Sequence, residues 1–262
     1  MKLILLVLGL CLLCFLGMVL YLYVNQRKIL YYPQPLDRDW DHVKANVEYE
    51  YELERDGVRL RGWLLNPENK HLLVYYGGNG EEASWLIDLF KPLSDTATLL
   101  INYRGYGESE GKPTEKDIVA DSLALLDAIK GQYDTFVLLG RSLGSGVAVQ
   151  VAAQCEVDRV ILVTPYDSIA TVGQGMYPWA PVRLLSKDPF DSLAVAGNVE
   201  EPTLFLIAET ASIIPHKHSE ALYEAWKEPK QWIVIRDSDH NSITEFPAYW
   251  QAVKDFIGAA NR

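Results

Sequence analysis

The sequence predicts an α/β fold with a mostly parallel central sheet, helices on both faces of the sheet, and one transmembrane helix before it. Strand patterns alternate with helical patterns from residue 71 to residue 257, as in parallel sheets. The uncharged run from Leu3 to Val24 is long enough to cross a bilayer. A third observation is Gly140-Arg141-Ser142-Leu143-Gly144, which lies between a strand pattern and a small-residue helix pattern.

Length and charge fit one globular domain with a short N-terminal addition. The chain has 262 residues, 49% of them hydrophobic, and a formal net charge of −11. Lys2, Arg27 and Lys28 contribute +3, so the remaining residues carry −14. Because an acidic body is a poor ligand for polyanions, we expect no nucleic-acid partner. The sequence does not specify an oligomeric state.

Residues 1–28 are predicted to be an uncleaved membrane anchor, with the membrane crossed by Leu3 to Val24. A cleaved signal peptide is the alternative, but the apolar run is too long and no A-x-A-like cleavage site follows it. Cys11 and Cys14 each follow a leucine rather than a small residue, which argues against a lipoprotein. Positive charges on the two sides nearly balance, so the positive-inside rule assigns no orientation.

Residues 29–46 are expected to form a juxtamembrane linker, and residues 47–262 the α/β domain. Val47 to Leu53 alternates as a half-exposed strand, and Asp56-Gly57 predicts a hairpin turn into a return strand over residues 58–65. Further strands are predicted over residues 71–76, 97–102, 135–139, 159–163, 203–208 and 231–235, and helices over residues 82–93, 114–130, 143–153, 216–226 and 244–257.

The regular alternation lapses between Thr164 and Val199, and residues 165–198 are a possible lid segment. Within it, Met176 to Val182 is apolar, aromatic and interrupted by prolines. An insert at this place in the chain tends to cover an active site, which makes it a candidate acyl-binding lid. An ordinary packed connection is the alternative.

The glycine-flanked Ser142 is predicted to sit at a nucleophile elbow, a sharp turn that raises the serine hydroxyl above the sheet. Gly140 and Gly144 leave out Cβ atoms that would collide with neighbouring backbone. The amides at the start of the following helix point toward negative charge forming beside Ser142. Ser142 is therefore the candidate nucleophile, and the Leu143 amide is a candidate oxyanion donor. A plain glycine-rich turn is the alternative.

A serine nucleophile needs a base, and with this motif the acid and then the histidine follow the serine along the chain. His240 comes directly after the last predicted strand and is the candidate base. His42 lies before the sheet, and His71 opens a strand. His216 and His218 begin a helix, where we expect them to be exposed to solvent.

The second oxyanion donor is expected from the loop after the strand over residues 71–76. That loop reads Gly77-Gly78-Asn79-Gly80, and the Asn79 amide is the candidate. A simple glycine turn is again the alternative. No metal or organic cofactor is implied.

These segments together resemble the membrane-anchored α/β-hydrolase-domain serine hydrolases, a branch that includes protein depalmitoylases and many bacterial members of unassigned substrate. The resemblance runs from about Gln26 to the C-terminus. It implies the α/β-hydrolase fold and cleavage of a carboxylic ester or thioester, with an acyl-chain substrate favoured by the anchor. Its marks are Leu30-Tyr31-Tyr32-Pro33, Asn102-Tyr103-Arg104-Gly105-Tyr106-Gly107-Glu108-Ser109-Glu110-Gly111, Gly140-Arg141-Ser142-Leu143-Gly144, Pro189-Phe190-Asp191-Ser192 and Asp239-His240-Asn241.

The chain departs from this family pattern at two positions. The oxyanion loop of the family usually reads His-Gly-Asn, and Gly77 stands where the histidine would be. The catalytic acid of the family lies four residues before Pro215, and that position is Ala211. An alanine cannot orient an imidazole or stabilise its charged form, and loss of the acid can lower turnover by about 10⁴.

Two carboxylates could replace the missing acid. Glu209 is the first candidate, since it lies two residues earlier on the same loop, and Asp167 is the second, with a helix cap as its other interpretation. The third possibility is that no acid is present. Two functions stay open: a serine hydrolase using Ser142 and His240, or a catalytically reduced protein of this fold that binds a ligand or partner. Ala211 would also fit an introduced change in an active enzyme.

Overall fold

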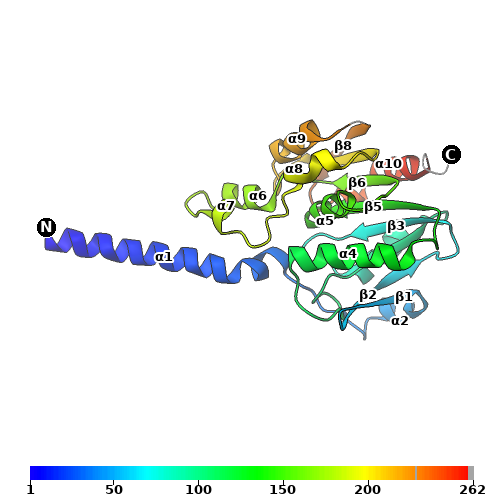
Figure 1. Ribbon diagram of the computed structural model, residues 1–262, viewed down its shortest axis with the longest axis horizontal. Helices are drawn as coiled ribbons and strands as arrows, with labels where there is room; N and C mark the ends of the chain where they lie inside the picture. The colour runs from blue at the N-terminus through cyan, green and yellow to red at the C-terminus, as the bar shows by residue number, and fades with distance from the viewer. Residues whose placement is uncertain (228, 259–262) are drawn as a thin grey trace.

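A computed structural model describes residues 1–227 and 229–258, and in this part of the chain the strands form one eight-stranded sheet (Figure 1). The strand order is β1-β2-β4-β3-β5-β6-β7-β8. The hairpin of β1 and β2 joins the sheet antiparallel to β4, and all later pairs are parallel. The predicted, mostly parallel sheet is therefore confirmed. Its strands are β1 (Glu50–Arg55), β2 (Val58–Leu65), β3 (His71–Tyr76), β4 (Ala97–Ile101), β5 (Thr135–Arg141), β6 (Arg159–Val163), β7 (Thr203–Thr210) and β8 (Lys230–Asp239).

Helices cover both faces of the sheet, which is why its central strands are apolar along their whole length. Along β3, Leu72 and Val74 join the core on one face, whereas Leu73 and Tyr75 join the core on the other. The first face is covered by α4 (Glu115–Ile129), α5 (Leu143–Ala152) and α9 (His216–Ala225), and the second by α3 (Ile87–Phe90) and α10 (Pro247–Gly258). Shorter elements are α2 (Asp41–Lys44), α6 (Ile169–Met176), α7 (Val182–Leu185), α8 (Ser192–Val195) and the 3₁₀ turns η1 (Val47–Tyr49), η2 (Ala83–Leu86), η3 (Ala196–Asn198) and η4 (Ile243–Glu245).

Local signals placed most elements correctly and two incorrectly. Asp56 and Gly57 both have positive φ (53° and 72°), as the predicted hairpin turn requires. The strand expected from Val47 begins only at Glu50, because the Tyr49 N–H bonds back to the Asn46 carbonyl and forms a 3₁₀ turn. The helix expected over residues 82–93 is reduced to η2 and α3. Pro92 lies two residues after the end of α3, where it disfavours continuation of the helix.

The N-terminal helix α1 (Lys2–Tyr31) projects from the body as one 30-residue rod (Figure 1). Its most apolar window has a mean hydropathy of 3.1 and none of that window is buried, which makes it a candidate membrane span. The helix continues past residue 28 into the expected linker, and Tyr31 in its last turn is fully buried. It ends where Tyr32 adopts a left-handed conformation (φ 48°) before Pro33.

The end of α1 is fixed to the loops beside the sheet. The Tyr31 carbonyl accepts hydrogen bonds from the Gly80 N–H (3.0 Å) and from the Tyr106 hydroxyl. The Gly107 N–H donates to the Gln34 carbonyl at 2.7 Å. Two of the sequence marks, Leu30 to Pro33 and Arg104 to Gly107, therefore serve to hold α1 against the domain.

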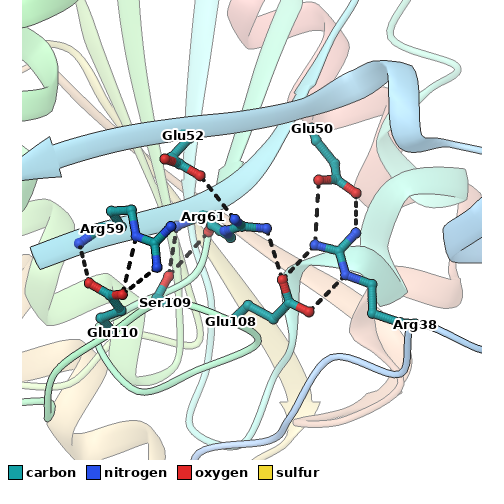
Figure 2. A network of polar contacts seen from close by, with 8 residues as sticks. All are labelled: Arg38, Glu50, Glu52, Arg59, Arg61, Glu108, Ser109 and Glu110. Carbon is teal, nitrogen blue, oxygen red and sulfur yellow. Dashed lines mark hydrogen bonds and ion pairs between the residues drawn. The ribbon is translucent and has the colours of Figure 1, made fainter.

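A charged network continues this attachment along the chain (Figure 2). The Arg38 guanidinium bridges Glu50 on β1 and Glu108, with Arg38 Nε 2.7 Å from Glu108 Oε1. Glu108 also accepts a hydrogen bond from Arg61 on β2, at 2.9 Å. Single exposed ion pairs contribute little to stability, but this network ties the segment after α1 to both strands of the hairpin.

Candidate active site

Ser142 lies at the sharp turn between β5 and α5. Its backbone has φ 51° and ψ −118°, a strained conformation for a residue other than glycine. The turn is held by a hydrogen bond from the Ser142 N–H to the Val163 carbonyl on β6 (2.9 Å). A Cβ at Gly140 would overlap the backbone of Gly144, and a Cβ at Gly144 would overlap the backbone of Tyr76. The predicted need for both glycines is confirmed.

His240 follows β8 directly and reaches the serine. Its Nε2 lies 2.9 Å from Ser142 Oγ, and the residue is only 5% exposed. Burial and, to a smaller extent, the positive charge of Arg141 lower the pKa of His240 from 6.5 to about 4, and Asp239 opposes this shift. The imidazole is therefore neutral at neutral pH and is able to accept a proton from Ser142.

Two backbone amides beside Ser142 are free to bind a ligand. Asn79, Ser142 and Leu143 line the same cavity. In the oxyanion loop, the Gly78 N–H donates to Glu81 and the Gly80 N–H to Tyr31, whereas within the described chain the Asn79 N–H meets no protein acceptor. Leu143 is the first residue of α5, so its N–H has no partner inside the helix. Their role as oxyanion donors stays a prediction.

A buried ion pair connects the three loops of the site. Arg141 Nη1 lies 2.8 Å from Glu81 Oε1, and its Nη2 donates to the carbonyl of His240 at 3.1 Å. The other oxygen of Glu81 accepts from the Gly78 N–H (2.6 Å) and the Tyr75 hydroxyl (2.9 Å). The pair thus fixes the elbow, the oxyanion loop and the histidine loop relative to one another.

Sequence reasoning missed this ion pair. Arg141 occupies the variable position of the serine motif and Glu81 lies in the loop before η2, so no periodic pattern links them. Their side chains are 14% and 12% exposed. Buried charges need partners, so an arginine at the end of a largely apolar strand was the one signal that could have indicated a partner.

The position expected to hold the acid follows β7 directly but carries no polar group. Thr210 and Asp239 pair at the ends of β7 and β8, so Ala211 and His240 are the residues that follow the two strands. Across residues 1–227 and 229–258, no carboxylate lies within ion-pair distance of His240. The histidine therefore has a serine on one side and no acid on the other.

Both substitute carboxylates are occupied elsewhere. Glu209 accepts a hydrogen bond from the Asp237 N–H at 2.7 Å. Asp167 accepts from the Ser168 N–H at 2.6 Å and from His218 Nδ1 at 2.9 Å. The structure does not bring either one to His240, and the catalytic role of Glu209 stays a prediction.

The expectation that His216 and His218 are exposed is wrong. His218 is 5% exposed and is paired with Asp167, because the first turn of α9 packs against the loop after β6. His216 is partly buried, and its Nε2 lies 2.8 Å from the carbonyl of Ala208. A helix start alone gave no sign of this buried carboxylate beneath it.

A cavity of about 260 Å³ reaches Ser142 and is lined mainly by apolar side chains. The possible lid segment forms one wall, with Ile169, Val172 and Met176 of α6. A second wall is α1, which contributes Val19 and Leu22 among others. Sequence reasoning anticipated the first wall and not the second.

Comparison with known proteins identifies the family. The alpha/beta hydrolase family matches residues 76–258. An uncharacterized protein of Mycobacterium tuberculosis is 31% identical over 236 residues, which cover 86% of this chain and 84% of that protein. An uncharacterized membrane protein of Saccharomyces cerevisiae is 29% identical over 260 residues, or 91% of this chain and 90% of that one. An esterase of Pyrococcus furiosus shares the fold, with a TM-score of 0.67 and 17% identity over 86% of this chain and 96% of its own. This chain therefore belongs to the alpha/beta hydrolase family.

Proposed function

We propose that this protein is a membrane-anchored serine hydrolase that cleaves a carboxylic ester or thioester carrying an acyl chain. The observation that carries the proposal is the 2.9 Å contact between Ser142 Oγ and His240 Nε2. The serine is held at a positive φ, which costs about 1–3 kcal/mol. Such strain is typical of a turn that positions a reactive group.

The proposed reaction uses groups of this chain alone. His240 Nε2 takes the proton of Ser142 as its Oγ attacks the substrate carbonyl carbon. The N–H groups of Asn79 and Leu143 hold the resulting oxyanion. His240 then gives the proton to the leaving oxygen or sulfur, so that an alcohol or thiol departs and an acyl-serine remains. Water, deprotonated by His240, releases the carboxylic acid and restores the serine.

The anchor in this proposal is α1, crossing the membrane once. None of the residues in its most apolar window is buried, which is unfavourable in water and favourable in a bilayer. The yeast relative described as a membrane protein aligns over 91% of this chain. Tethering next to a mainly apolar cavity favours an acyl-chain substrate.

Glu209 is the proposed third member of the triad. Its carboxylate would have to leave the Asp237 N–H to reach Nδ1 of His240. The absence of an acid beside His240 in the described residues also favours a second candidate function. A protein with Ala211 in place of the acid could bind a ligand or partner in the cavity without turning it over.

Labelling with a fluorophosphonate probe, together with turnover of a p-nitrophenyl ester, separates these two functions. We expect the full chain to be labelled, Ser142→Ala to lose all labelling, and His240→Ala to be labelled far more slowly. If neither the full chain nor Ala211→Asp is labelled, the hydrolase proposal is wrong and the ligand-binding function replaces it.

A further inference from the structure

We propose that the transmembrane helix forms part of the substrate site, and that the acyl chain enters between α1 and the lid segment directly from the hydrocarbon layer. This extends the proposed hydrolase function, on which it rests, by naming the source of the substrate and its path to Ser142. Figure 1 shows α6 and α7 beside the half of α1 nearer the body.

The cavity is shaped for a hydrocarbon chain. The cavity is lined by Val19, Leu22 and Ile29 of α1, by Val172 and Met176 of the lid segment, and by Ser142. With a volume of about 260 Å³ and a mainly apolar lining, the cavity can take up hydrocarbon beside Ser142. An acyl chain longer than the cavity would continue along α1.

The helix is a fixed wall of this cavity. Arg27 donates two hydrogen bonds to the buried carboxylate of Asp188, at 2.7 and 3.2 Å. Gln26 accepts from the Lys187 N–H at 2.7 Å and donates to the Leu185 carbonyl at 3.2 Å. These four hydrogen bonds hold the C-terminal part of α1 against the lid segment, close to the candidate active site.

Apolar contacts continue between α1 and the lid segment deeper into the membrane. The Trp179 ring packs edge-on against Phe15, with ring centroids 6.1 Å apart. Phe15 precedes Val24, the last residue of the uncharged run, by nine residues, which is about 14 Å along a helix. The tip of the lid segment therefore lies at the depth of the hydrocarbon layer when α1 spans the bilayer.

The surface of the lid segment fits that position. Met176, Trp179 and Leu184 are 55%, 43% and 83% exposed, and Trp179 contacts Phe15 of α1. An exposed apolar surface of this kind is unfavourable in water and typical of contact with a membrane. Because this exposed surface is continuous with α1, we infer that membrane lipid covers it.

The polar end of the same cavity orients the substrate. The Gly80 N–H bonds to the Tyr31 carbonyl, so the oxyanion loop lies beside the last turn of α1. Lys187 lies 4.1 Å from the ring centre of Tyr23, as expected where a helix leaves the apolar layer. An acyl substrate with its tail along Val19 would thus place its carbonyl group at Ser142.

The test uses the full chain in phosphatidylcholine vesicles with two esters, p-nitrophenyl palmitate in the bilayer and p-nitrophenyl acetate in water. Leu22→Trp should narrow the cavity and lower kcat/KM for the palmitate ester at least tenfold, whereas kcat/KM for the acetate ester should change less than twofold. Leu20→Trp is the matched control, because Leu20 is 61% exposed on the same helix and does not line the cavity. Equal effects of Leu22→Trp on both esters, or no effect on either, would overturn the inference.

A second pair of variants tests entry from the bilayer without altering the cavity. Trp179→Asp should slow turnover of vesicle-bound palmitate at least threefold and leave acetate turnover unchanged. Trp85→Asp, at a tryptophan of similar exposure (48%) outside the lid segment, should affect neither. Unchanged palmitate turnover in Trp179→Asp would contradict entry from the bilayer. Failure of the unmodified chain to cleave acetate or react with a fluorophosphonate would instead count against the hydrolase function itself.

Discussion

Two buried histidines of this protein have complementary sets of partners. His218 and His240 are each 5% exposed, and each makes a 2.9 Å side-chain contact. His218 pairs through Nδ1 with the carboxylate of Asp167 and has no nucleophile. His240 pairs through Nε2 with Ser142 and has no carboxylate within the described residues.

The comparison shows that the chain contains all parts of a catalytic triad, divided between two places. The carboxylate of Asp167 is committed to a structural contact between the loop after β6 and α9. Without an acid on its other nitrogen, the base beside Ser142 has its pKa set mainly by burial, which lowers it to about 4. A weakly basic imidazole accepts the serine proton with difficulty, so we expect slow turnover.

Placing a carboxylate beside His240, as His218 already has, should produce the largest change in activity. In Ala211→Asp the new carboxylate lies at the end of β7, beside the histidine loop. We expect kcat to rise by about 10²–10⁴, because an acid orients the imidazole and stabilises its charged form. Ester turnover at pH 7 measures this, with Ala211→Asn as the uncharged control. An equal gain in Ala211→Asn would show that charge is not the cause.

The depressed pKa of His240 predicts a dependence of stability on pH. Between about pH 6.5 and pH 4 the unfolded chain binds a proton on this histidine and the folded chain does not. The contribution is therefore fully present above pH 6.5 and is lost as the pH falls toward 4, at about 3 kcal/mol in total.

Urea unfolding at pH 7 and pH 4 measures this loss, and His240→Gln should lose about 3 kcal/mol less over the same range. Ala211→Asp should also lose less, because a carboxylate raises the folded-state pKa. If His240→Gln shows the same pH dependence as the unmodified chain, His240 is not the group responsible.

Removing the acid from His218 should affect stability and leave the chemistry intact. Asp167→Ala leaves Nδ1 of His218 and the Ser168 N–H without their partner, at a cost of about 1–3 kcal/mol. Turnover per folded molecule should change less than twofold, since Asp167 contacts neither Ser142 nor His240. Asp167→Asn retains an acceptor and should lose less stability. A hundredfold fall in kcat with unchanged stability would instead identify Asp167 as the triad acid.

How far the sequence predicts this molecule depends on the range of the interactions. The sheet, the elbow and His240 follow from local patterns, because strand periodicity, two glycines and chain order specify them. The partners of His218 and Arg141 do not, since each is set by packing between segments far apart in sequence. The α1 wall of the cavity is of the same kind, because hydropathy indicated a candidate span and not the Arg27–Asp188 contact that holds this helix.

Glu209→Gln should have the smallest combined effect on stability and activity. It tests whether Glu209 replaces the missing triad acid. Glutamine keeps an oxygen for the Asp237 N–H, so stability should stay within about 0.5 kcal/mol. As the proposed acid, Glu209 reaches His240 only by giving up that hydrogen bond, so we expect kcat to fall by about tenfold rather than the 10⁴ of a pre-positioned acid. Single-turnover acylation measured by stopped flow reports this step directly. An unchanged acylation rate would mean that Glu209 only supports Asp237 and that Ser142 and His240 act as a pair.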